Sequence, residues 1–267
     1  MSFIKETGRF LMKTGLSPMF RIRQKDFVLR FYPSSISLVL WVDYHRRRTS
    51  YPTDENFFRS YLQPSDVVVD VGANIGFFSL MSAALAGETG RVYAIEAHPK
   101  TYEYLQGNIA ANKFENISAY NLALGNRDGK VHFSDQSRDD RNAVVQDADG
   151  VEVTMARLDD IGITDNHIDL LKIDVEGYEK FVMEGAADIL SRTRCVYFES
   201  HDVALSEFDC TAAELIRILT DQGFAIYRIQ DDMVTPVSKD HQSPVCENLI
   251  AVRNLDEFLS RTKLSQA

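Results

Sequence analysis

Four acidic residues stand where apolar segments typical of buried β-strands end, and each segment precedes a turn. They are Asp70, Glu96, Asp174 and Glu199. A single acid in this position is most simply a helix cap or a surface turn, but four of them indicate a shared cleft. Ligands of open α/β sheets bind beyond the carboxyl ends of the strands. We therefore expect these carboxylates to meet at one functional site.

The turn that follows Asp70 is the second chemical feature. Gly72 and Gly76 bracket it, and a missing side chain lets a backbone approach a ligand closely. The turn does not match the dinucleotide fingerprint, because Asn74 stands where a glycine would lie under a pyrophosphate. Glu96, twenty residues past Gly76, is placed to accept both ribose hydroxyls. Together these residues predict a bound adenosine compound without phosphates, and Asp70 and Asn74 suit the amino-acid end of S-adenosylmethionine (SAM).

If the bound SAM donates its methyl group to a hydroxyl, the reaction needs a base, or a metal that lowers the pKa of the hydroxyl. Asp174, Glu199 and His201 are the candidates. Adjacent strands lie about 5 Å apart, so Asp174 and Glu199 become neighbours if their strands pair. Two carboxylates and an imidazole suit a divalent ion, His201 alone suits a base, and the alternative is that Glu199 and His201 cap the next helix. We predict His201 as the base, and no metal.

An alternation of strand and helix patterns positions these residues. The predicted strands are 67–71, 91–96, 117–122, 168–173 and 195–198, and the predicted helices are 76–86, 99–112, 178–190 and 211–222. Strands near 224–229 and 247–253 are expected to pair antiparallel. The alternation predicts an α/β fold with a doubly wound, mostly parallel sheet. Residues 125–150, rich in Asp, Asn and Gly, are predicted as an insertion with short strands at 130–133 and 151–155 and a mobile loop at 134–148.

The chain is divided into three parts by these patterns. Residues 1–52 form a predicted N-terminal extension, with a helix at 3–14 and strands at 26–32 and 36–42 that make a hairpin around Pro33. A helix at 54–62 opens the domain, which covers 53–255. Residues 256–267 are predicted as a C-terminal tail, either a short helix or a frayed end.

The charge of the chain is unevenly distributed. The 267 residues carry a net charge of −10, which excludes a whole-protein basic field for nucleic acid. Residues 1–50, however, hold ten Lys/Arg and three Asp/Glu, a net of +7, so the remainder carries −17. The basic segment suits a membrane surface, an anionic substrate or a partner, and its simplest interpretation is a solvated helical face.

Cysteine usage and hydropathy indicate a soluble, cytoplasmic protein. Cys195, Cys210 and Cys246 are too scattered for a disulfide framework or a metal pair. Basic residues interrupt the N-terminal apolar segment, so no secretory signal is expected. The longest apolar run of that region, 38–42, is too short to cross a bilayer.

Several motifs occur in an order that resembles the FkbM-type methyltransferases, over about Thr53 to Arg253. They are Val67–Ser79, Glu96 with Pro99, Asn121–Gly125, Leu158–Asp160 and Leu171–Glu179. The resemblance implies a class I methyltransferase (Rossmann-like) fold, SAM as the cofactor, and O-methylation, commonly of a sugar or natural-product hydroxyl. The acceptor is thus expected to be a small molecule or a glycan.

The resemblance also implies a role for individual residues. Gly72, Asn74 and Gly76 are expected around the methionine portion, Glu96 at the ribose, Asn121 and Ala123 near the adenine, and Asp174 at the methionine amine or the reacting centre. For Asn121 and Ala123 the alternative is an ordinary exit from a strand into a turn. For the whole chain the alternatives are a non-catalytic scaffold that binds the cofactor, and an NAD-dependent oxidoreductase.

Overall fold

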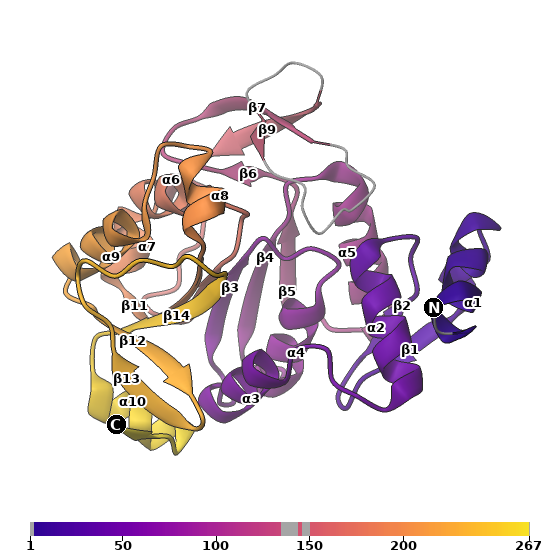
Figure 1. Cartoon of the computed structure of the whole chain (residues 1–267), viewed down its shortest axis with the longest axis horizontal. Helices are drawn as coiled ribbons and strands as arrows, with labels where there is room; N and C mark the ends of the chain where they lie inside the picture. Colours follow the sequence, from indigo (N-terminus) through magenta and orange to yellow (C-terminus); the bar gives the residue numbers. More distant parts are fainter. Residues whose placement is uncertain (1–2, 135–143, 146–149, 267) are drawn as a thin grey trace.

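The computed structural model describes residues 3–134, 144–145 and 150–266, and a nine-stranded sheet forms its centre (Figure 1). From one edge to the other the strands are β15 (Ser265–Gln266), β13 (Met233–Pro236), β12 (Ala225–Gln230), β14 (Glu247–Val252), β11 (Thr193–Ser200), β10 (Ile168–Ile173), β3 (Val67–Val71), β4 (Arg91–Ile95) and β5 (Ile117–Tyr120). The five strands from β11 to β5 are parallel, and β14 lies antiparallel between β11 and β12. The predicted doubly wound sheet with an antiparallel C-terminal pair is confirmed.

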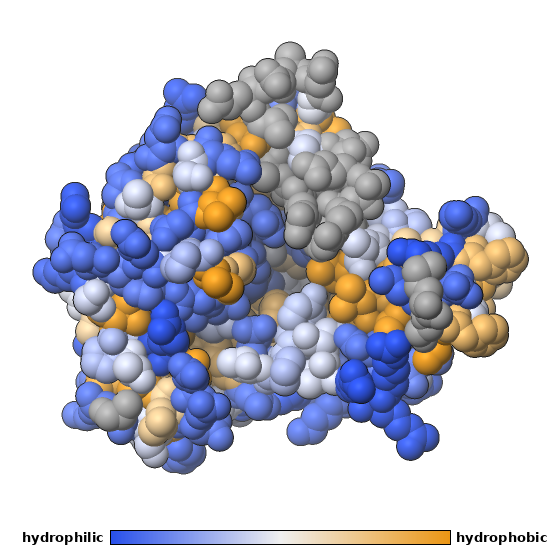
Figure 2. All heavy atoms as spheres, viewed as in Figure 1, coloured by the Kyte–Doolittle hydropathy of each residue, from blue (hydrophilic) through white to orange (hydrophobic). Residues whose placement is uncertain are grey.

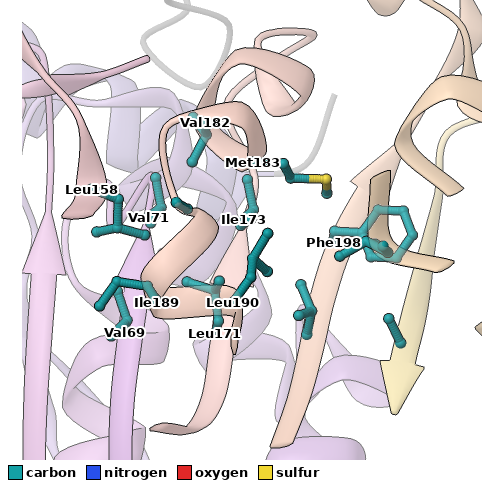
Figure 3. Packing of buried hydrophobic residues seen from close by; sticks show 14 of the residues in the cluster. Val69, Val71, Leu158, Leu171, Ile173, Val182, Met183, Ile189, Leu190 and Phe198 are labelled. Atoms are coloured by element: carbon teal, nitrogen blue, oxygen red, sulfur yellow. The ribbon is translucent and has the colours of Figure 1, made fainter. Parts of the chain in front are cut away.

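Helices cover both faces of this sheet because its central strands are apolar on both sides. One face packs against α3 (Pro52–Tyr61), α4 (Phe77–Ala86), α5 (Pro99–Asn112) and α10 (Leu255–Thr262), and the other against α6 (Glu179–Glu184), α7 (Ala187–Ser191), α8 (Asp202–Ser206) and α9 (Ala212–Asp221). Val68 packs with the helices of the first face, and its neighbour Val69 packs with those of the second face. Figure 3 shows this second face, where Val69 and Leu171 of the sheet lie against Ile189 and Leu190 of α7.

The predicted helix 178–190 was wrong in one respect, because the structure divides it into α6 and α7. The break lies at Gly185, where a Cβ atom would come within 2.0 Å of the Gly125 carbonyl oxygen. The second helix then starts anew under the carboxylate of Asp159, which accepts hydrogen bonds from the backbone N–H groups of Asp188 (3.1 Å) and Ile189 (2.9 Å). A close backbone approach from a distant segment therefore decides where the first helix ends.

The N-terminal extension contains a hairpin, but its strands lie within residues 21–30 and not at the predicted 26–32 and 36–42. It is formed by β1 (Arg21–Arg23) and β2 (Val28–Arg30), preceded by α1 (Phe3–Lys13) and the 3₁₀-turn η1 (Ser17–Met19). The predicted strand 36–42 was wrong, since it lies inside helix α2 (Ser35–Arg46). The Ser34 hydroxyl accepts a hydrogen bond from the Ser37 N–H (3.0 Å) and starts this helix. Helical spacing then places Trp41 in a stacked contact with Phe31.

Both chain ends pack on the central domain. Asn112 and Asn108 of α5 accept hydrogen bonds from the backbone N–H groups of Val28 (2.7 Å) and Arg30 (2.8 Å) in β2. At the other end, Arg261 of α10 forms an ion pair with the buried Asp66 at 2.8 Å. Of the two forms expected for the last residues, the structure therefore contains the helix.

A second, four-stranded sheet lies beyond the carboxyl ends of β3 and β4 (Figure 1). Its order is β6 (Ala123–Leu124), β9 (Val151–Ala156), β7 (Gly129–Phe133) and β8 (Val144–Val145). The two predicted strands of the insertion are thus confirmed as β7 and β9. The loop predicted at 134–148 lies, apart from Ser134 and 144–145, outside the described residues. Over the described part of the chain, every helix is too short or too polar to cross a bilayer.

Candidate active site

A cavity of about 340 Å³ opens at the carboxyl ends of the parallel strands. Its polar lining comes from the turn after β3, from Glu96 after β4, and from the ends of β10 and β11. The four strand ends therefore meet as the parallel topology requires. The face drawn in Figure 2 is hollowed between the halves of the molecule that carry α8 and α2.

The turn after β3 lies directly against the end of β10. Gly72 has φ +78°, and a Cβ atom there would come within 1.9 Å of the Asp174 carbonyl oxygen. Asn74 also has a positive φ of +51°, and its side-chain oxygen accepts a hydrogen bond from the next backbone N–H, that of Ile75 (2.7 Å). Gly76 starts α4 and packs against Leu105. The glycines thus allow a turn that a chain with side chains would not form.

We expect Gly72→Ala to lower the free energy of unfolding by more than about 2 kcal/mol, because it combines a strained φ with a backbone clash. Gly87→Ala is the matched control: Gly87 has a similar φ of +67°, but nothing lies within 4 Å of the place that a Cβ atom would occupy. Urea denaturation of both variants measures the difference. Equal losses for the two would show that the approach to Asp174 is unimportant.

Glu96 ties the turn after β3 to the loop after β4. One carboxylate oxygen accepts a hydrogen bond from the Asn74 N–H (2.8 Å), and the other accepts one from the His98 N–H (2.9 Å). Burial raises the pKa of Glu96 to about 7, although these hydrogen bonds lower it. Asn121 donates to the carbonyl oxygens of Glu96 (2.9 Å) and Ala97 (2.8 Å). Asn121 thereby fixes the backbone of the loop after β4.

Asn121 and Ala123 are both absent from the described lining of the large cavity. Ala123 is buried in β6 and lines a separate space of about 30 Å³, together with Ala97 and Leu122. The small space shares Gly72 with the large one. Neither residue therefore lines the large cavity directly.

Lys172 is the buried cation at the base of the site. Its ammonium group lies 3.2 Å from an Asp70 oxygen and 3.3 Å from an Asp174 oxygen, as expected from its register opposite Asp70. Burial lowers the pKa of Lys172, but Asp174 and Asp70 together raise it above its usual range. The other Asp70 oxygen accepts a hydrogen bond from the Ser79 hydroxyl (2.5 Å). Asp70 is thus enclosed beneath the cavity, whereas Asp174 lines it.

Glu199 faces Asp174 across the cavity mouth. Burial and then the charge of Asp174 raise the pKa of Glu199 to about 7. The Cys246 thiol donates a hydrogen bond to Glu199 at 2.8 Å. Oxygen atoms of Asp174, Glu176 and Glu199 all lie within 4.8 Å of one another, so the mouth is strongly acidic.

His201 lies just past the end of β11, as the N-cap residue of α8. It is not among the described residues that line the cavity. Its neighbour Asp202 bonds the backbone N–H groups of Ala212 (3.2 Å) and Ser243 (2.7 Å) and so fixes the start of this helix. The structure therefore brings Asp174 and Glu199 together and leaves His201 at the helix start.

Several residues of the cavity were not found by sequence reasoning. Its apolar wall is formed by Ile36, Tyr51, Phe77, Phe78 and Phe133. The two phenylalanines follow the glycine turn and were recognisable as its continuation. Ile36, Tyr51 and Phe133 come from the extension and the insertion, and Cys246 reaches Glu199 only because β14 pairs with β11.

The donors and acceptors of the cavity fit SAM. Glu96 offers a carboxylate, the type of group that accepts hydrogen bonds from ribose hydroxyls, the turn offers backbone at close range, and Asp174 offers negative charge to a cationic group. The volume of about 340 Å³ lies within the range of small-molecule sites. The lining of the cavity therefore suits a cationic nucleoside derivative as its ligand.

Comparison with known proteins identifies the family. The sequence model of the FkbM methyltransferase domain matches residues 70–226. The chain is 29% identical to the 31-O-demethyl-FK506 methyltransferase FkbM of Streptomyces tacrolimicus (64% of this chain, 77% of the relative), and 25% identical to the 2-O-methyltransferase NoeI of Sinorhizobium fredii (76% and 85%). A solved methyltransferase FkbM from Methylobacillus flagellatus KT superimposes with a TM-score of 0.44 at 16% identity (81% of this chain, 54% of that one). The chain belongs to the FkbM methyltransferase family and is a SAM-dependent methyltransferase.

Proposed function

We propose that this methyltransferase acts on a hydroxyl group of a saccharide or a secondary metabolite. The observation that carries the proposal is Glu199, a cavity-lining carboxylate whose pKa is raised to about 7 by burial and by Asp174. A base with a pKa near the working pH is the most effective at taking a proton from a hydroxyl. The names of the two relatives, an O-demethyl-FK506 methyltransferase and a 2-O-methyltransferase, support oxygen as the accepting atom.

In the proposed complex the chain holds SAM by its polar turn residues. Glu96 accepts hydrogen bonds from the ribose, the backbone around Gly72, Asn74 and Gly76 surrounds the methionine portion, and Asp174 attracts the amine. Asp70 acts indirectly, since its carboxylate is bonded by Lys172 and Ser79. Asn121 and Ala123 support the adenine side of the pocket.

When bound, SAM supplies an electrophilic methyl group. Glu199 takes the proton of the attacking hydroxyl, and the apolar wall aligns the acceptor and excludes water. The geometry favours Glu199 over His201 as this base, because Glu199 lines the cavity, whereas His201, the N-cap residue of α8, is not among the described residues that line it. The assignment of His201 stays a prediction, to be decided by the variants described in the Discussion.

Glu96→Ala is expected to weaken SAM binding by about 1–3 kcal/mol, through the loss of a charged hydrogen-bond acceptor. Because Glu96 also bonds two backbone N–H groups, Glu96→Gln is the companion variant that keeps the shape of the side chain. Isothermal titration calorimetry measures both affinities, and circular dichroism checks the fold. An unchanged affinity of Glu96→Ala would remove Glu96 from the site.

The proposed reaction is tested by release of S-adenosylhomocysteine from a panel of hydroxylated acceptors. The panel contains saccharides and hydroxylated secondary metabolites, and matched acceptors whose hydroxyl is already methylated. Turnover with the free hydroxyl and none with its methyl ether supports the proposal. SAM binding without turnover on any acceptor would favour the cofactor-binding scaffold instead, and family membership decides against the NAD-dependent oxidoreductase.

A further inference from the structure

Exposed apolar side chains are concentrated at the N-terminus. Ten large hydrophobic residues are exposed in the described structure, and seven of them belong to α1, η1, α2 and the adjoining turns. The seven are Phe3, Phe10, Leu16, Met19, Phe20, Val39 and Tyr44. We call these elements, residues 3–48, the N-terminal lobe. Such a concentration of exposed apolar surface marks an interaction site.

Helix α1 has two different apolar sides. One side packs on α2, where a Cβ atom at Gly8 would lie 2.9 Å from the Trp41 ring. The other side carries Phe3 and Phe10, which lie seven residues apart on the same face and are 82% and 63% exposed. The packing of the lobe thus uses only part of the apolar surface of α1.

Two threonine hydroxyls on the side of Phe3 and Phe10 are bonded to backbone carbonyl groups of α1. The Thr7 hydroxyl donates to the Phe3 carbonyl oxygen (3.0 Å), and the Thr14 hydroxyl donates to the Phe10 carbonyl oxygen (3.0 Å). Moving this face out of water therefore leaves neither hydroxyl without a partner.

Two basic residues border the same face. Arg9 and Lys13 lie one helical turn apart and form a short Lys/Arg stripe along α1, with the exposed Glu6 beside them, whereas Lys5 lies on the opposite side of the helix. The exposed run Arg46–Arg48 adds positive charge at the end of α2. Residues 1–50 carry a net charge of +7 while the rest of the chain carries −17, so the positive field belongs to this lobe.

The lobe adjoins the active-site cavity. Ile36 of α2 lines the cavity, and Val39, three residues later on the same side of the helix, is 47% exposed. Figure 2 shows hydrophobic atoms between the hollow and the end of the molecule formed by α1. A surface held against the lobe would therefore lie close to the mouth of the site.

We propose that the N-terminal lobe docks on an anionic phospholipid bilayer. Exposed aromatic residues beside a Lys/Arg stripe, on a helix too short to span, are typical of helices that lie in the membrane interface. Phe3 and Phe10 enter the headgroup region, and the basic residues pair with anionic headgroups. A second copy of the chain fits less well, because a symmetric contact would bring two positively charged lobes together. For a contact with another face, the other large exposed hydrophobics, Val203, Met233 and Val245, are scattered over α8, β13 and the loop before β14.

The test is sedimentation of the full chain with vesicles of phosphatidylcholine, with and without phosphatidylglycerol. We expect binding only to the anionic vesicles, weakened by salt. Phe3→Ser with Phe10→Ser should lower the partition coefficient by about tenfold or more, and Arg9→Glu with Lys13→Glu by a similar factor. Met233→Ser, an exposed apolar residue on β13, and Arg217→Glu, an exposed basic residue on α9, are the matched controls and should bind like the parent.

Equal binding to neutral and anionic vesicles, no binding to either, or binding that both paired variants retain would overturn the proposal. Light scattering without lipid tests the rival partner: self-association abolished by the same variants, with no vesicle binding, would assign the lobe to a second copy. Circular dichroism and SAM titration confirm that each variant is folded. Vesicle binding needs no methyl transfer, so its failure and that of the proposed function are distinguishable.

Discussion

Glu199→Gln is expected to lower kcat by about 100-fold or more, because general-base catalysis contributes about 10²–10⁴-fold to such reactions. The amide keeps the shape of the side chain and can still accept a hydrogen bond from Cys246, but it takes no proton. SAM affinity, measured by calorimetry, should change little. Turnover is measured as S-adenosylhomocysteine released with the acceptor found in the hydroxyl panel.

The pH dependence gives an independent check of the same residue. A base works only when it is ionised, and burial together with Asp174 raises the pKa of Glu199 to about 7. The kcat/KM of the parent should therefore fall as pH drops below about 7, by about tenfold per pH unit. In Glu199→Gln this acid limb should disappear. A parent profile flat down to about pH 5 would mean that Glu199 titrates like an ordinary carboxyl and that the base lies elsewhere.

Two further variants separate Glu199 from its neighbours. Glu207→Gln changes an exposed acid after α8 and should leave kcat within about twofold, as expected of a surface substitution. His201→Ala should lower turnover much less than Glu199→Gln if Glu199 is the base. The reverse order, an active Glu199→Gln and an inactive His201→Ala, would restore the assignment of His201.

Lys172→Met is expected to have the largest effect on stability, with a loss of about 3–5 kcal/mol in the free energy of unfolding. Methionine matches the length of the side chain but removes the ammonium group that pairs with the buried Asp70 carboxylate. An uncompensated charge would then remain beneath the cavity, beside the turn at Gly72. Chemical denaturation at neutral pH measures the loss, and SAM titration reports whether the site above is disturbed.

The control for Lys172→Met is Lys180→Met, which breaks an ion pair with Glu214 at the surface. Exposed pairs contribute about 0–1 kcal/mol, so this variant should be nearly as stable as the parent. Adding Asp70→Asn to Lys172→Met should recover part of the loss, because the buried charge is then removed as well. A loss below about 1 kcal/mol for Lys172→Met, or no recovery in the double variant, would show that the pair is not coupled.

The central fold was predictable because its local patterns and its tertiary environment agree. Eight of the eleven residues in the runs around Val69 and Leu171 are β-branched or aliphatic, which suits strands buried on both faces, and the structure places them at the centre of the sheet. The segment 36–42 shows the opposite case. It is equally apolar, but Ser34 caps it and Trp41 packs in the core as part of a helix. A short apolar run does not by itself distinguish a strand from a helix. Here the cap at Ser34 and the packing of Trp41 favour the helix.

The sequence by itself determined the cofactor-type turn, the parallel sheet and the set of acids at its edge, since these depend on residue types at fixed local spacing. Only the tertiary structure decided which of these acids line the cavity and which is enclosed beneath it. Asp70 is enclosed by Ser79 of α4 and by Lys172, and His201 becomes the N-cap residue of α8. Glu199 gains its raised pKa from burial and from Asp174 on the neighbouring strand. Burial and charge at a site depend on segments distant in the chain, and local spacing does not record them.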